Sequence, residues 1–144
     1  MRHMTTRLTI GSFLVGVLAL IIGCNDYALD TEWRSGNYRL IAIDTRGQMN
    51  LIDTSDKDWE GVGPTVFSIG ADGKFIVLAQ HPSTNAFGEF NRSVTQYFIV
   101  DRRRGSSPAD REKKLRGPLS KEEFDRLSTT LSLPKFSKTF NDLK

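Results

Sequence analysis

The chain has 144 residues, a formal net charge of +3 and a single cysteine. This length suits one domain with its own hydrophobic core. One cysteine cannot form an intramolecular disulfide, so the composition excludes a disulfide-stabilised scaffold.

Residues 1–23 have the layout of a secretory signal peptide. Arg2 and Arg7 precede an apolar run, LTIGSFLVGVLALIIG, that ends directly before Cys24. The run would span roughly 24 Å as a helix, which is shorter than the hydrocarbon core of a bilayer at ~30 Å. We therefore expect a cleaved signal rather than a permanent transmembrane helix.

The residues Ile21-Ile22-Gly23-Cys24 resemble the bacterial lipobox. That resemblance implies lipid attachment at Cys24, with palmitate-type acyl chains and cleavage before the cysteine. Several acyl chains hold a protein stably at a bilayer. The expected location is a bacterial cell membrane or outer membrane, with the domain facing the periplasm or the exterior. The alternative is a structural cysteine after a plain signal peptide.

Cleavage would also change the charge. Residues 1–23 contain two arginines, no lysine and no acidic residue, so the net charge would fall from +3 to +1. A nearly neutral chain gives no reason to expect a nucleic-acid partner. Residues 24–37 are polar and aperiodic, and we expect them to be a lipid-anchored tether to a single domain at residues 38–144.

Five runs rich in β-branched and aromatic residues predict strands, at residues 38–44, 49–53, 65–70, 74–80 and 93–101. Gly47 and the Asp72-Gly73 pair lie between the first two and the next two runs, which predicts two hairpins. The run from residue 75 to residue 79 is apolar at every position, so we expect a strand covered on both faces.

The C-terminal part predicts a loop and then a helix. Residues 102–118 are charged and contain scattered Gly and Pro, which is typical of a surface loop. Ser120 and Glu123 have the spacing of a capping box, and Leu119 and Phe124 that of a hydrophobic staple. We expect a helix over residues 120–132, ended by Pro134.

These elements predict an α+β fold, in which a single antiparallel β-sheet meander of about five strands packs against one C-terminal helix. A curled, half-open β-barrel is the alternative. The segments VGPTVFSIG, FIVLAQHP, TQYFIVD and GPLSKEEF resemble a small family of uncharacterised bacterial lipoproteins. The resemblance covers most of residues 36–133 and implies the same location and fold, but it carries no catalytic motif.

An acidic segment places Asp56, Asp58 and Glu60 before Gly61, as in the first half of an EF-hand calcium loop. The position of the bidentate glutamate is occupied by Phe67, and no flanking helices are predicted. We therefore expect no metal site here, although the segment could form an acidic contact surface.

His81 is the only histidine after the leader and follows a predicted strand. A catalytic role would need a nucleophile and a carboxylate such as Asp44 or Asp101 nearby, and no known signature provides them. We expect this imidazole to be hydrogen-bonded within its own loop, and we expect no cofactor.

Arg102, Arg103 and Arg104 begin a segment with seven cations in fifteen residues. This segment could contact anionic lipid headgroups or remain a solvated loop. Four aromatic residues of the expected tether and loops could form an exposed contact surface or fold over the sheet: Trp33, Trp59, Phe87 and Phe90.

The leading hypothesis is a lipid-anchored envelope protein without enzymatic activity. It would bind a protein partner or another envelope component through its loops, at a contact surface that includes His81. One alternative is an immunity-type or inhibitor lipoprotein directed against a toxin or hydrolase. The other alternative is a hydrolase centred on His81.

Overall fold

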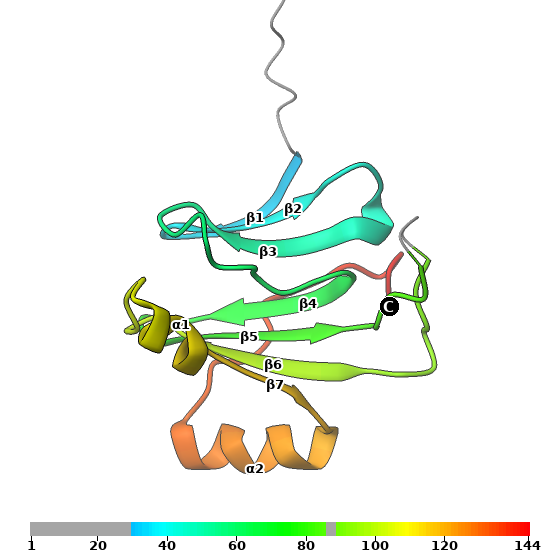
Figure 1. Cartoon of the computed structure of the whole chain (residues 1–144). Coiled ribbons are helices and arrows are strands. Elements are labelled where there is room, and N and C mark those ends of the chain that lie inside the picture. Colours follow the sequence, from blue (N-terminus) through cyan, green and yellow to red (C-terminus); the bar gives the residue numbers. More distant parts are fainter. Residues whose placement is uncertain (1–29, 86–88) are drawn as a thin grey trace, which may run out of the picture.

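The computed structural model describes residues 30–85 and 89–144, which form two layers of antiparallel sheet. Figure 1 shows a three-stranded sheet lying over a five-stranded sheet, with helix α2 (Lys121–Leu131) beneath the second one. The sequence predicts one sheet. The prediction of a strand-rich fold with a C-terminal helix is confirmed, but the single-sheet arrangement was wrong and a second helix, α1 (Pro108–Lys114), is present.

The three-stranded sheet contains β1 (Asp30–Ser35), β2 (Tyr38–Ala42) and β3 (Met49–Asp53), in that order. A 3-10 helix, η1 (Arg46–Gln48), forms the turn of the predicted hairpin between β2 and β3. Residues 30–35, which were expected in the tether, instead pair with β2. Trp33 of β1 packs against the core, so burial of this ring accounts for the additional strand.

The five-stranded sheet has the order β7-β6-β5-β4-β8. The second predicted hairpin joins β4 (Val66–Ala71) and β5 (Phe75–Gln80), and β6 (Gln96–Asp101) pairs with β5, as expected for consecutive strands. The edges are β7 (Leu115–Leu119) and the short β8 (Lys138–Thr139). Neither sheet is closed on itself, and the strands are divided between two sheets instead of curling as one sheet into the half-open barrel of the alternative prediction.

Strand β5 explains why the fold needs two sheets. All six of its residues are buried, so both of its faces need a covering layer, as its apolar run predicted. The three-stranded sheet covers one face, and the core between the sheets is made of aliphatic side chains from both: Leu40, Met49, Leu51, Ile69, Ile76, Leu78 and Val100. Helix α2 covers part of the other face, where Phe124 packs with Val77 and Ile99.

The predicted capping box of α2 is confirmed. The Glu123 amide donates to Ser120 Oγ at 3.2 Å, and the Ser120 amide donates to Glu123 Oε2 at 2.8 Å. The loop predicted for residues 102–118 was wrong in part, because it contains α1 (Pro108–Lys114) and β7. Ser107 caps α1 by accepting from the Asp110 amide, and Pro108 suits the first helical turn.

No helix within residues 30–85 and 89–144 is long and apolar enough to cross a membrane.

Candidate functional site

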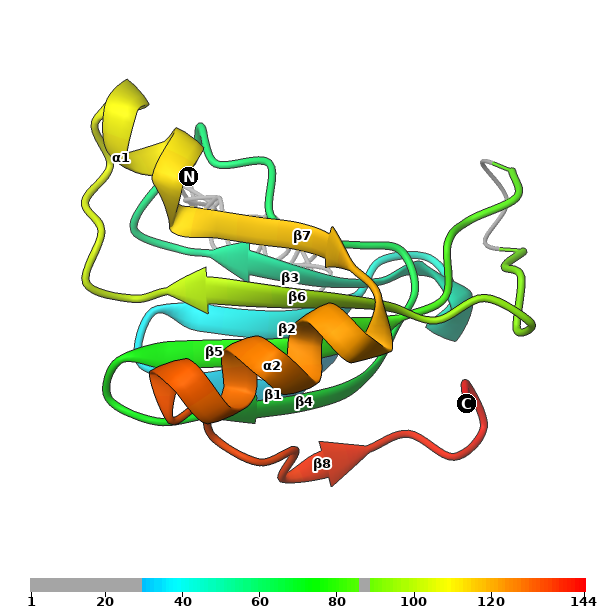
Figure 2. The ribbon, with the colours of Figure 1, turned by 90° about the horizontal axis from the view of Figure 1, so that it is seen from below.

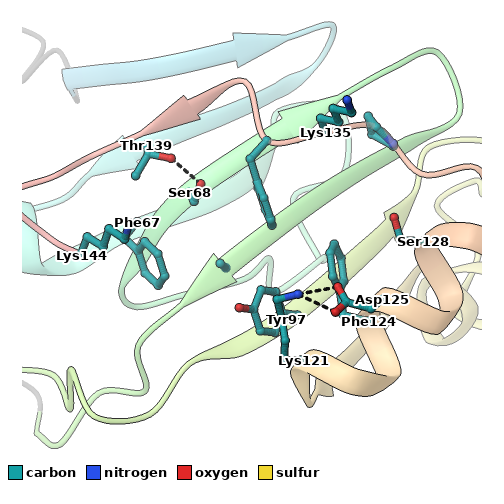
Figure 3. A pocket seen from close by; sticks show the side chains of 13 residues that line it. Phe67, Ser68, Tyr97, Lys121, Phe124, Asp125, Ser128, Lys135, Thr139 and Lys144 are labelled. Atoms are coloured by element: carbon teal, nitrogen blue, oxygen red, sulfur yellow. Dashed lines mark hydrogen bonds and ion pairs between the residues drawn. The ribbon is translucent and has the colours of Figure 1, made fainter.

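A cleft of about 480 Å³ lies on the α2 side of the five-stranded sheet, between α2 and residues 134–144. We call it the α2 cleft; Figure 2 shows from below the segments that flank it, α2 and the chain around β8 (Lys138–Thr139), and Figure 3 shows the side chains that line it. Its floor includes Ser68, Ala79 and Tyr97, from β4, β5 and β6. Ser68 and Ala79 are paired on neighbouring strands. Because both side chains are small, they leave space above the sheet next to the part that α2 covers.

Helix α2 forms one wall. Lys121, Phe124, Asp125 and Ser128 line the cleft, and their spacing places them on one helical face. The Phe124 ring stacks on Tyr97, with the ring centroids 4.9 Å apart. The helix therefore contributes an aromatic base to the cleft and a polar rim above it.

The opposite wall is held against β4 by the main chain. The Ser137 amide donates to the Ile69 carbonyl at 2.9 Å, and the Phe140 amide donates to the Phe67 carbonyl at 2.8 Å. A Cβ atom at Gly70 would lie 2.0 Å from the Lys135 carbonyl oxygen, so only glycine permits this close approach. The hydroxyls of Ser68 and Thr139 lie 2.7 Å apart and fix the floor to this wall.

Phe136 brings a third ring to the cleft. Its centroid lies 5.7 Å from that of Phe124 and 6.4 Å from that of Tyr97, and 36% of the residue is exposed. Three aromatic rings from a strand, a helix and a distant segment thus meet at one place. Such clusters bind apolar side chains strongly when these are buried against them.

The rim of the α2 cleft carries more positive than negative side chains. Its charged lining residues are Lys121, Asp125, Lys135 and Lys144. Lys121 pairs with Asp125 at 2.5 Å, and this hydrogen-bonded carboxylate raises the pKa of Lys121. In the described ranges, the ammonium groups of Lys135 and Lys144 have no ion pair, so they are available to an anionic group.

Among the described residues, no histidine or cysteine lines this cleft, and the hydroxyl of Ser68 is engaged by Thr139 and by the Lys138 carbonyl. Residues 35–144 match the sequence model of a family described as "Protein of unknown function (DUF3997)". The chain belongs to this family. No curated protein and no solved structure gives a significant match. The DUF3997 match includes every residue that lines the α2 cleft.

The acidic segment of the DUF3997 chain is only partly a surface. The Asp56 side chain is 2% exposed and lies 2.8 Å from the guanidinium of Arg111, which also pairs with Asp58 at 3.0 Å. The hydrogen bond from Arg111 holds the pKa of Asp56 below its usual range. Asp56 is therefore not available for contacts with a partner, because its carboxylate is buried and paired with Arg111. Asp58 and Glu60 remain exposed.

His81 is buried, with 3% of the residue exposed, so it is not part of an exposed contact surface. Its ring stacks on Phe67 and Phe90, with centroid distances of 4.4 and 5.9 Å. Nδ1 lies 2.7 Å from the carbonyl oxygen of Val94, which confirms the expected hydrogen bond within its own loop. Within the described ranges, Nε2 is buried without a hydrogen-bond partner, and no nucleophile contacts it.

The three consecutive arginines have different surroundings. Arg102 donates to Ser35 Oγ at 3.0 Å and to the Asp72 carbonyl, so it ties the turns of the two sheets together instead of forming a free surface. Arg103 and Arg104 are exposed and pair with Asp101. Trp33, Trp59 and Phe90 pack against the core between the sheets. Residues 1–29, with Cys24, and Phe87 lie outside the described residues.

The sequence alone does not predict the α2 cleft. The sequence indicates the apolar face of α2. The only local signal of a polar face beside it is the helical spacing of positions 121, 125 and 128. No local pattern indicated that residues 134–144 lie along β4, because that contact joins parts of the chain some 70 residues apart.

Proposed function

We propose that this DUF3997 protein is a lipid-anchored envelope protein that binds a segment of a partner protein in the α2 cleft, without catalysis. The observation that carries the proposal is the combination of three aromatic rings with the ammonium groups of Lys135 and Lys144, which have no ion pair in the part of the chain that the structure describes. The bound segment would place an apolar side chain on the rings and a carboxylate against the lysines.

The size and shape of the cleft support this occupant. A volume of about 480 Å³ accommodates a few side chains, and the cleft lies open between a helix and an extended segment. Aromatic residues at the centre of a patch with charged residues at its edge are typical of protein interfaces. No histidine of the described ranges lines the cleft, and the hydroxyls of Ser68 and Thr139 are hydrogen-bonded to each other, which favours binding over nucleophilic chemistry.

The position of the cleft is compatible with an anchored protein. The chain enters the fold at the start of β1, in the three-stranded sheet, whereas α2 lies below the five-stranded sheet (Figure 1). Cys24 precedes β1 by six residues, which can extend by at most roughly 20 Å. A lipid at Cys24 would thus hold the start of β1 within roughly 20 Å of the bilayer, at the three-stranded sheet and not at α2.

Lipid attachment is tested with Cys24→Ala in the native host, by metabolic labelling with a palmitate analogue. We expect labelling to be lost and the protein to be unprocessed or released. Asn25→Ala, which keeps the thiol, is the control and should be labelled normally. A label that persists on Cys24→Ala would contradict the proposal.

Binding in the cleft is tested with a photo-crosslinking amino acid placed at Phe136 in the anchored protein. Ile43, which is also exposed but lies outside the cleft, is the control position. We expect a discrete protein adduct from position 136 only. The same adduct should disappear when Lys135→Glu and Lys144→Glu are added, because the carboxylate then meets like charges.

The charge-matched control is Arg34→Glu with Lys57→Glu, two exposed cations outside the cleft. This control should retain the adduct. Equal crosslinking from Ile43, or an adduct that survives reversal of Lys135 and Lys144, would contradict binding in the cleft. A toxin or hydrolase in the adduct would identify the protein as an immunity-type inhibitor.

A further inference from the structure

A second hollow, of about 180 Å³, lies near the C-terminal end of α2, outside the α2 cleft. It is bordered by the end of β6, by α1, by β7 and by Leu131 of α2. We call it the basic pocket, because four exposed cationic side chains line it: Arg103, Arg104, Lys113 and Arg116.

The fold of residues 102–119 creates this pocket. Strand β7 returns antiparallel to β6 and pairs Arg116 with Ile99, so Arg116 lies beside the end of β6 at Asp101. Helix α1 makes the reversal between the two strands and carries Lys113 in its last turn. Cations that a solvated loop would keep apart are thereby brought to one concave surface.

The positive charge of the basic pocket is only partly balanced. Of the residues that the structure describes, Asp101 is the only acidic one in its lining; its carboxylate accepts from Arg103 at 2.8 and 2.9 Å and lies 3.6 Å from Arg104. Lys114 also borders the pocket, but its ammonium is paired with Asp53. Lys113 and Arg116 have no ion pair within the described ranges. Four exposed cations therefore face one carboxylate.

We propose that the basic pocket binds a phosphate group. Guanidinium groups hold phosphate oxygens in pairs, and a phosphate offers three or more acceptor oxygens to several cations at once. A single carboxylate ligand would leave most of these donors unused. A cavity needs roughly 10–15 Å³ of such volume to hold one water, so a pocket of about 180 Å³ has room for a phosphate group.

The phosphate group belongs to a free phosphate compound or to a lipid headgroup, and two probes distinguish these sources. The full chain in a nonionic detergent is titrated with pyrophosphate by calorimetry at low salt. In the second arm the probe is dihexanoyl phosphatidylglycerol, compared with dihexanoyl phosphatidylcholine, which has the same chains but a zwitterionic headgroup. This proposal is independent of the α2 cleft.

The test variant is Lys113→Glu with Arg116→Glu, and Arg34→Glu with Lys57→Glu is the control of equal charge change. We expect the test variant to weaken binding of the effective probe at least about tenfold and the control less than about twofold, because only the former loses charge-assisted contacts. Thermal unfolding checks that each variant is folded. Lys113→Gln with Arg116→Gln replaces the test variant if reversal prevents folding.

Binding of pyrophosphate that depends on Lys113 and Arg116 supports a site for free phosphate compounds. Binding of phosphatidylglycerol alone, with the same dependence, supports a headgroup site. Absence of binding to both probes, equal binding of the two lipids without pyrophosphate binding, or equal losses in the test and control variants would overturn the proposal.

Discussion

Lys114 and Asp53 form an ion pair inside the protein, with Nζ 2.6 Å from Oδ2 and side chains that are only 2% and 5% exposed. Lys114 ends α1 and Asp53 ends β3, so the pair connects the segment after β6 with the three-stranded sheet. The ammonium also lies 4.8 Å from the Trp59 ring centroid and 5.3 Å from that of Tyr38. The ion pair and the two aromatic rings offset the free-energy cost of removing both charges from water.

Removing one partner of this pair should destabilise the protein strongly. We expect Lys114→Ala to lower the free energy of unfolding by about 3–5 kcal/mol, because Asp53 is left buried without its cation. Urea denaturation measures the loss. Lys121→Ala, which breaks an exposed pair with Asp125, is the matched control and should cost at most about 0.5 kcal/mol. Similar losses in the two variants would show that the buried pair is not needed.

The same pair should make stability depend on acidic pH. Burial alone would raise the pKa of the Asp53 carboxyl, but hydrogen bonds from Lys114 and Ser55 outweigh it and hold the pKa below its usual range. A carboxyl with a lowered pKa contributes stability above its unfolded pKa, near ~3.9, and this contribution is lost as the pH falls through the folded pKa. The advantage of the wild type over Asp53→Asn should therefore shrink as the pH is lowered from about 5 to about 2.

Urea denaturation across this pH range measures that advantage. Glu60→Gln, which removes an exposed carboxylate near β3, serves as the control and should stay within ~0.5 kcal/mol of the wild type throughout. An advantage over Asp53→Asn that stays constant down to the lowest pH would contradict the pKa shift of Asp53.

The capping box of α2 gives a local prediction. Ser120→Ala removes the acceptor of the Glu123 amide and should lower the free energy of unfolding by about 1 kcal/mol. Amide hydrogen exchange should accelerate in the first turn of α2. Ser106→Ala, at an exposed loop position, is the control and should change neither measurement. Unchanged exchange in Ser120→Ala would mean that the cap does not hold the helix start.

The other end of α2 should tolerate a stabilising change. Ser132 adopts a left-handed conformation, with φ of 53°, which costs a non-glycine residue free energy. We expect Ser132→Gly to raise the free energy of unfolding by roughly 0.5 kcal/mol, since relief of this strain exceeds the added entropy of the unfolded chain. Ser132→Ala should not be stabilising. Destabilisation by glycine, measured by thermal unfolding, would contradict this interpretation.

Sequence reasoning succeeded where the signals join close neighbours along the chain. Gly73 marked the turn between β4 and β5, and the Ser120 and Glu123 pair marked the start of α2, because turn and cap chemistry act within a few residues. The same reasoning missed β1, since its place depends on Trp33 packing against the core between the sheets.

The sequence by itself determined most strands, the hairpins, the capped helix and the burial of both faces of β5. Only the tertiary structure decided that two sheets supply this burial, that Lys114 meets Asp53, and that the α2 cleft and the basic pocket exist. Local patterns reflect contacts between near neighbours, whereas the cleft depends on pairs such as Ser68 and Thr139, 71 residues apart. Such pairs meet only when the packed core brings distant segments together, and no short stretch of sequence encodes that meeting.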